Sequence, residues 1–206
     1  MKAPAYWAQA TQELASRDPV IASIAAGSAG LTLRSRGDAF ATLARSIVGQ
    51  QISVKAAESV WQKFAAALPV VNPASVAAHP VEALRACGLS GSKVVYLQDL
   101  AVHFEKGTLN PARWPDLSDD ELIEQLTRVR GIGRWTAEMF LIFYMMRPDI
   151  LPLADLGVQK AMRLHYNHGR PLGVRKLAAL NKLWQPWRSV ATWYLWRSLD
   201  PIPVEY

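Results

Sequence analysis

Cysteine is nearly absent from this sequence, with Cys87 the single one among 206 residues. One thiol cannot form an internal disulfide, supply a thiolate zinc site or hold an iron–sulfur cluster, because each of these needs further cysteines. The four histidines also form no metal-binding set, since His165 and His168 lie close together in what we expect to be a solvated helix end. We therefore expect that no cofactor is required for catalysis.

Long apolar runs and strand-like alternation are also missing. No window approaches the ~18 uninterrupted apolar residues of a membrane span, and residues 1–10 contain one lysine and no long apolar core. We expect an intracellular, cytoplasmic protein that does not bind membranes, associated with the nucleoid if it is bacterial. Apolar residues recur at helical spacing instead, which predicts an all-α fold.

The charge balance favours a polyanionic partner. Lysine and arginine number 23 against 17 acidic residues, which gives a net charge of +6 and a pI near 9.6. A chain of 206 residues is long enough for one well-buried domain, and we expect a single domain over residues 1–206.

Helix boundaries can be predicted from capping residues and apolar spacing. Asp38 is a good N-cap for the apolar pattern Phe40–Val48, and Ser118-Asp119-Asp120-Glu121 is typical of a capping box before another helix. Further predicted helices cover 53–68, 81–87, about 92–107, 137–146, 156–166, 174–184 and 187–199.

Gly131-Ile132-Gly133 is the most informative motif of the chain. Two glycines that flank one apolar residue allow a tight reversal between helices and leave backbone N–H groups uncovered where a phosphate can approach. The same motif is also compatible with a plain turn in a helical hairpin. Asp155, which follows 22 residues after Gly133, favours the functional interpretation.

These two motifs together resemble the helix-hairpin-helix (HhH-GPD) DNA glycosylase superfamily. Within it, the sequence is similar to the 3-methyladenine DNA glycosylase II type, through Gly131–Ala137, Val48–Ser53, Cys87–Ser90 and Trp187–Ser189. The resemblance runs from about Phe40 to Trp196 and implies a minimal form without the extra N-terminal β-rich domain of larger members. It implies two helical lobes with the active-site cleft between them, the hairpin at about 118–146, and a second lobe formed by the N- and C-terminal helices.

Asp155 is the predicted catalytic residue. Aspartate is a common N-cap, so a purely structural role is the alternative. The same geometry would keep the carboxylate ionised, and a fixed carboxylate stabilises the oxocarbenium-like transition state of N-glycosidic cleavage and can orient the attacking water. No second acid accompanies Asp155. An N-alkylated purine already carries positive charge and leaves as a neutral base, so a single acid favours such substrates.

The resemblance also assigns a base pocket. Trp135 and Trp196 match tryptophans that line this pocket, where electron-rich indole faces attract a cationic base, and Met139 and Tyr144 are weaker candidates. Strand-cleaving members present a nucleophilic lysine at the position of Trp135, so its tryptophan implies a monofunctional enzyme that uses water. Most of the other six tryptophans are expected in the core.

Several residues are predicted to contact DNA: Gly131, Gly133, Arg134, Thr136, Ser53 and Lys93. Gln51 matches the side chain that fills the gap left by a flipped base, with Ile52 as the alternative inserting residue. A polar turn with Ser53 as N-cap is the structural explanation of the same segment. By resemblance alone, the backbone oxygens of Thr127, Val129 and Gly131 would hold a sodium or potassium ion that bridges to a DNA phosphate.

The sequence therefore predicts a monomeric, monofunctional glycosylase that removes alkylated purines, of the 3-methyladenine and 7-methylguanine type, from double-stranded DNA. One alternative is a non-catalytic DNA-binding protein that uses the hairpin only as a phosphate clamp. Another is a glycosylase for mismatched or oxidised bases.

Overall fold

A computed structural model of the chain describes residues 3–35 and 38–199. Every regular element in these ranges is a helix, which confirms the all-α prediction. Within the same ranges, no helix has both the length and the apolar character needed to cross a bilayer. The chain divides into two compact units, Met1–Ser35 with Leu141–Tyr206 (unit 1) and Arg36–Phe140 (unit 2).

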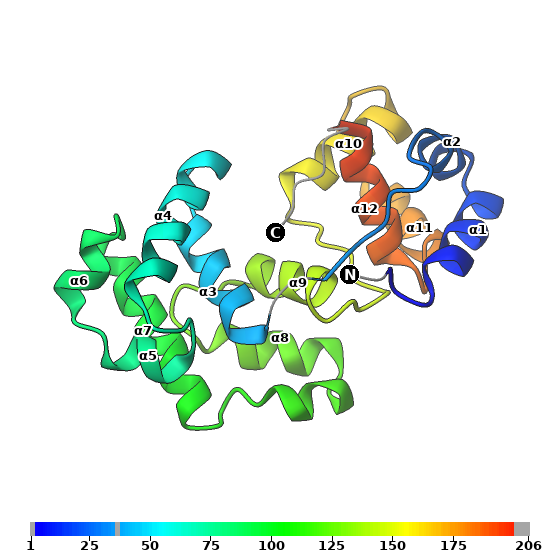
Figure 1. Cartoon of the computed structure of the whole chain (residues 1–206). Helices are drawn as coiled ribbons and strands as arrows, with labels where there is room; N and C mark the ends of the chain where they lie inside the picture. The colour runs from blue at the N-terminus through cyan, green and yellow to red at the C-terminus, as the bar shows by residue number, and fades with distance from the viewer. Residues whose placement is uncertain (1–2, 36–37, 200–206) are drawn as a thin grey trace. The chain divides into compact units, whose positions relative to one another are not determined.

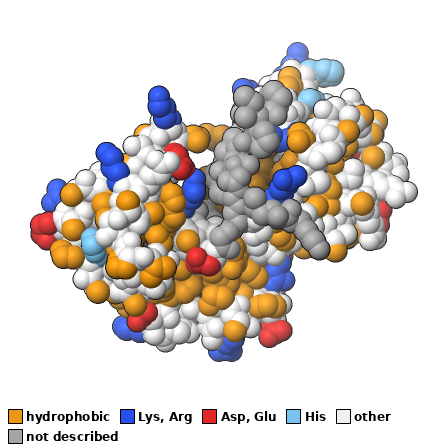
Figure 2. Space-filling model, in the orientation of Figure 1, with side chains coloured by type: hydrophobic (Ala, Val, Ile, Leu, Met, Phe, Trp, Pro, Cys, Tyr) orange, Lys and Arg blue, Asp and Glu red, His pale blue; other side chains and the backbone are white. Residues whose placement is uncertain are grey.

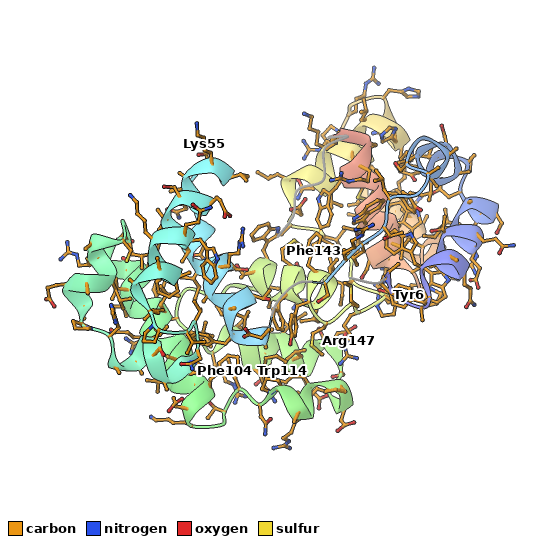
Figure 3. The ribbon with its side chains drawn as sticks, in the orientation of Figure 1. Tyr6, Lys55, Phe104, Trp114, Phe143 and Arg147 are labelled. Atoms are coloured by element: carbon orange, nitrogen blue, oxygen red, sulfur yellow. The ribbon has the colours of Figure 1, made fainter. Side chains whose placement is uncertain are left out.

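Unit 2 is built around helix α7, which packs against α3, α5 and α6. Its apolar core includes a row of aromatic rings, of which Figure 3 labels Phe104 and Trp114. The ring centroids of Phe104 and Trp114 are 6.1 Å apart, and those of Trp114 and Phe140 are 5.4 Å apart. The elements of this unit are α3 (Ala39–Gly49), α4 (Val54–Ala67), α5 (Pro73–Ala78), α6 (Val81–Ala86), α7 (Gly91–Glu105), the 3₁₀ helix η1 (Pro111–Asp116), α8 (Asp119–Thr127) and most of α9 (Arg134–Phe143).

Unit 1 joins the two ends of the chain. Its elements are α1 (Trp7–Arg17), α2 (Pro19–Gly27), α10 (Leu156–Asn167), α11 (Val174–Leu183) and α12 (Arg188–Leu199). Helix α12 is buried over residues 189–195 and packs against α1, α2 and α10. The blue N-terminal helices and the red α12 therefore lie side by side in Figure 1.

Local capping explains why the predicted helices begin where they do. The carboxylate of Asp38 accepts a hydrogen bond from the Ala41 amide at 2.9 Å. Ser118 and Glu121 form the predicted capping box, with the Ser118 amide donating to the Glu121 carboxylate at 2.8 Å. These side chains satisfy amide groups that have no acceptor inside the helix, so they fix the first residue of each helix.

Helix α9 differs from its predicted range of 137–146. It begins at Arg134, because the Gly133 carbonyl already accepts a helical hydrogen bond from the Ala137 amide at 3.0 Å. It ends at Phe143 and not at Met146, because Met146 adopts a left-handed conformation with φ of 54°. The structure also contains α5 and η1, which apolar spacing did not predict.

Candidate active site

The Gly131-Ile132-Gly133 motif lies in the turn between α8 and α9 in unit 2. Val129 and Ile132 are buried and anchor the turn, and the Ile132 amide donates to the Val129 carbonyl at 3.1 Å. The Arg130 amide donates to the carboxylate of Asp99 on α7 at 2.8 Å. The turn is thus fixed from both sides, and its two glycines occupy different environments.

Gly131 is required by the fold. Its φ of +81° is a backbone conformation that residues with a side chain rarely adopt. A Cβ at this position would lie 2.2 Å from the ring of Tyr96 on α7. The ring of Tyr96 therefore lies directly against the turn, and this contact alone excludes any larger residue.

Gly133 has the opposite surroundings, because a Cβ there would meet no atom within 4 Å. The residue is exposed and immediately precedes α9. The first amides of a helix point outward and carry a partial positive charge, so the N-terminus of α9 can accept a phosphate next to Gly133.

Three further predicted residues lie in the first turn of α9. Arg134 is exposed, and its guanidinium lies 3.0 Å from the Glu138 carboxylate and 3.6 Å from that of Asp120. Trp135 is 39% exposed, whereas Thr136 is buried. A phosphate at this helix end would thus compete with two carboxylates for Arg134, and it would reach the backbone at Thr136 and not its side chain.

The loop from Gly49 to Ser53 carries the predicted inserting residue. Gln51 is exposed and has a φ of 59°, and Ile52 is exposed as well. Ser53 is the N-cap of α4, with its hydroxyl accepting from the Ala56 amide at 3.3 Å. The structure therefore leaves both Gln51 and Ile52 as candidates.

Gln50 makes a contact that the sequence did not predict. Its side-chain amide donates to the carbonyl oxygen of Gly131 at 2.7 Å. This hydrogen bond ties the Gly49–Ser53 loop to the hairpin turn, although the two residues are 81 positions apart. The Gln50-Gln51 pair was visible in the sequence, but nothing in it indicated which of the two amides would face inward.

Lys93 is partly buried at the start of α7. Its ammonium group donates to the carbonyl of Val48 near the end of α3 at 2.8 Å, and burial lowers the pKa of this lysine. Lys93 therefore connects α7 to the helix that leads into the Gly49–Ser53 loop. A DNA contact by Lys93 stays a prediction.

The three carbonyls predicted to hold a monovalent cation belong to the same turn. Val129 and Gly131 each already accept one hydrogen bond, from the Ile132 amide and from Gln50 respectively. A carbonyl oxygen has two lone pairs, so each can accept a second partner. Uncharged oxygen donors suit a hard monovalent cation, and the donor set of Thr127, Val129 and Gly131 fits that group.

Asp155 belongs to unit 1, where it is the N-cap of α10 and is 9% exposed. Its Oδ1 accepts hydrogen bonds from the Val158 amide at 2.7 Å and from the indole N–H of Trp196 at 2.9 Å. These hydrogen bonds hold the carboxylate in one orientation.

Trp196 lies between this carboxylate and another ring. Its indole stacks on Phe143, with the ring centroids 5.6 Å apart and the planes at 17°. A Cβ at Gly157 would lie 3.1 Å from Asp155 Oδ1 and 3.1 Å from the Trp196 ring, so the absence of a side chain at Gly157 lets the two approach. The structure thus brings Asp155 and Trp196 together, and Phe143 is a residue that the sequence did not single out.

The segment that leads to Asp155 is held by the start of α12. The Arg188 guanidinium contacts both carboxylate oxygens of Asp149, at 2.7 and 3.0 Å. The Ser189 hydroxyl donates to the Arg147 carbonyl at 2.6 Å and accepts from the Ile150 amide at 2.9 Å. This gives a physical role to the Trp187-Arg188-Ser189 motif, which the sequence identified only by resemblance.

The remaining pocket candidates lie on or just after α9. Met139 is buried, and Tyr144 follows the last turn of the helix with its carbonyl accepting from the Ser35 hydroxyl at 3.3 Å. Neither observation tests a contact with a base. Of the tryptophans expected in the core, Trp7, Trp114, Trp184 and Trp193 are buried.

Comparison with known proteins agrees with this geometry. The protein named DNA-3-methyladenine glycosylase 1 of Schizosaccharomyces pombe is 35% identical over 162 residues, which cover 76% of this chain and 70% of that protein. A crystal structure of a DNA-3-methyladenine glycosidase from Bacillus halodurans superposes with a TM-score of 0.86 at 30% identity, covering 97% of this chain and 93% of that one.

A second similar structure contains nucleic acid. The Schizosaccharomyces pombe 3-methyladenine DNA glycosylase Mag1, in complex with abasic DNA, has a TM-score of 0.80 and 27% identity, with 96% of this chain and 98% of that chain covered. The family described as "HhH-GPD superfamily base excision DNA repair protein" matches residues 44–188, which include both the hairpin and Asp155. The chain belongs to the HhH-GPD superfamily of base excision DNA repair proteins.

Proposed function

We propose that this chain is a monofunctional DNA glycosylase that hydrolyses the N-glycosidic bond of alkylated purines in double-stranded DNA. The observation that carries the proposal is the buried carboxylate of Asp155, oriented by Val158 and Trp196 at the N-terminus of α10. Its relatives named as DNA-3-methyladenine glycosylases support the substrate class.

Asp155 acts on the sugar in this proposal. When the bond between base and deoxyribose breaks, positive charge develops on the sugar, and a fixed carboxylate lowers the energy of that charge without having to reorganise. The same carboxylate can orient a water molecule or accept its proton. The base leaves, the water oxygen takes its place on the sugar, and an abasic site remains.

The hairpin acts on the DNA backbone. The N-terminus of α9, with the open space around Gly133, binds a phosphate, while Gln51 or Ile52 fills the gap left by the flipped nucleotide. The carbonyls of Thr127, Val129 and Gly131 would hold a sodium or potassium ion, which adds positive charge next to that phosphate. None of these contacts reads a base, so they position any duplex equally.

Trp135 and Trp196 supply the base pocket, with Met139 and Tyr144 as further candidates. A cationic base such as 3-methyladenine is attracted to an indole face by up to ~2 kcal/mol when water is excluded. Since position 135 is a tryptophan and not a lysine, no Schiff base forms there and the DNA strand stays intact. This feature also disfavours a strand-cleaving glycosylase for oxidised bases.

The experiment is a base-release assay on methylated duplex DNA. We expect free 3-methyladenine and 7-methylguanine, with strand breaks only after alkali or heat opens the abasic site. Release of mismatched or oxidised bases alone would support the alternative substrate class, and duplex binding without any base release would support a non-catalytic clamp. A protein–DNA adduct trapped by borohydride would refute the water mechanism.

We further propose that the protein acts as a monomer in the cytoplasm, associated with the nucleoid if it is bacterial. Size-exclusion chromatography with light scattering, with and without duplex DNA, tests the first point. A dimer in the DNA complex would contradict it.

A further inference from the structure

The positive charge of this chain is concentrated in one segment. Residues 156–199 contain eight lysine and arginine residues and no aspartate or glutamate. This segment alone therefore carries +8, which exceeds the net charge of +6 of the whole chain. Its basic residues are Lys160, Arg163, Arg170, Arg175, Lys176, Lys182, Arg188 and Arg197.

The hairpin segment has the opposite balance. Residues 118–146 contain three arginines against five acidic residues, Asp119, Asp120, Glu121, Glu124 and Glu138. In addition, Arg128 and Arg134 lie within ion-pair distance of carboxylates of this same segment. The hairpin can thus hold a phosphate through neutral backbone groups, but it supplies no excess charge to attract a polyanion from a distance.

Six of the eight cations are exposed and lie on α10, on α11 and on the connection between them. Within the described part of the chain, no carboxylate lies within ion-pair distance of any of the six. Figure 2 shows basic and histidine side chains gathered at the end of unit 1 where α10 passes to α11. We call these six residues the basic surface: Lys160, Arg163, Arg170, Arg175, Lys176 and Lys182.

The outward face of α10 connects this surface to the candidate catalytic residue. Val158, Ala161 and Met162 are buried on the inner face, whereas Leu156 is 80% exposed, and Lys160 and Arg163 are exposed as well. Helix rise places Lys160 and Arg163 about 7.5 and 12 Å along the axis from Asp155. One DNA strand carries a phosphate about every 3.4 Å along the duplex axis, so for a strand that runs along α10 these distances would correspond to about two to four nucleotides.

We propose that the basic surface is a second DNA-binding site, which binds phosphates of the duplex two or more nucleotides from the damaged base. This inference rests on the proposed function for the identity of the partner. The site binds without regard to sequence, supplies most of the salt-dependent affinity, and leaves the hairpin to fix the position of the strand.

The test compares two double variants by their salt dependence of binding to an undamaged duplex. Lys160→Gln with Arg163→Gln removes two cations of the basic surface. The control, Lys106→Gln with Arg113→Gln, removes two exposed cations of unit 2. Lys106 follows the C-terminal end of α7 and Arg113 lies in η1, whereas Ser90 and Lys93 lie at the N-terminal end of α7. All four side chains are exposed, so circular dichroism and thermal melts should match those of the wild type.

We expect the slope of log affinity against log salt concentration to be smaller in magnitude by about 1.8 for the first variant, because each lost phosphate contact removes about 0.9 from that slope. When salt is raised from 50 to 200 mM, the fold-loss of affinity should be about 12 times smaller for this variant than for the wild type. The control should follow the wild type.

An unchanged slope for Lys160→Gln with Arg163→Gln would overturn the proposal, and would be the outcome if this surface served an acidic protein instead. An equal change in the control would also overturn it, because the effect would then come from net charge alone. The proposed function is tested separately by base release from methylated DNA, so failure of one is distinguishable from failure of the other.

Discussion

Asp155→Asn is the substitution that separates charge from structure in the candidate site. Both hydrogen bonds described for this carboxylate, from the Val158 amide and from the Trp196 indole, end on Oδ1. An asparagine side chain can place its amide oxygen at that position and accept both. Asparagine is also as good an N-cap as aspartate. The variant therefore keeps these contacts and loses the negative charge.

The size of the effect follows from what is lost. Removal of one preorganised electrostatic group commonly costs ~10²–10³ in rate, which corresponds to about 2.7–4.1 kcal/mol of transition-state stabilisation. The free energy of unfolding should change by less than about 1 kcal/mol, because the cap is preserved. Activity should thus collapse while thermal stability stays close to that of the wild type.

The assay is single-turnover release of 7-methylguanine from a duplex with enzyme in excess, together with a thermal melt. Asp38→Asn is a matched control, because Asp38 caps α3 through the same kind of bond, at 2.9 Å to the Ala41 amide. This control should release base at the wild-type rate. Release by Asp155→Asn within ten-fold of the wild type, or an equal loss in the control, would refute the catalytic assignment.

Gly131→Ala should lower the free energy of unfolding by about 2–4 kcal/mol in a denaturant melt, because its Cβ meets the Tyr96 ring and its φ is positive. At Gly133 there is open space for a side chain, so Gly133→Leu should not disturb the fold but should weaken binding of damaged and undamaged duplexes equally in a filter-binding assay. A loss of affinity for damaged DNA alone would contradict phosphate binding by the hairpin. Trp135→Leu should reduce excision of cationic 7-methylguanine up to about 30-fold more than excision of neutral hypoxanthine, and equal losses would refute the pocket. Arg188→Ala should slow single-turnover release by up to about 10²-fold without changing duplex affinity, because Arg188 positions the segment that leads to the Asp155 carboxylate. A proportional loss of duplex affinity would instead show a general folding defect.

Most helices could be predicted because their signals are local. A capping side chain and an apolar repeat act within a few residues, so the helices that follow Asp38, Ser53, Ser118 and Asp155 begin where the sequence indicates. The end of α9 depends on a left-handed residue at Met146, which methionine does not signal. Short elements such as α5 and η1 contain too few residues for a periodic pattern to emerge.

The site depends on contacts between distant segments, and these leave no pattern in the sequence. Tyr96 excludes a side chain at Gly131, and Gln50 binds the carbonyl of that same glycine, from positions 35 and 81 residues away. Arg188 reaches Asp149 across 39 residues. The sequence identified the glycines and the aspartate, because each carries chemistry of its own. It could not identify the residues that hold them in place.

Trp196 shows how such a contact changes the design of an experiment. The resemblance assigns this residue to the base pocket, yet its indole N–H is bound to Asp155 and one of its faces lies against Phe143. Cation–π attraction to a base would have to use the other face. A substitution of Trp196 by leucine would remove the ring face and a hydrogen bond to the candidate catalytic carboxylate together. Its effect would therefore combine pocket and catalysis. Trp135 lies in the first turn of α9 and is 39% exposed, and it is the tryptophan chosen for the test of the base pocket.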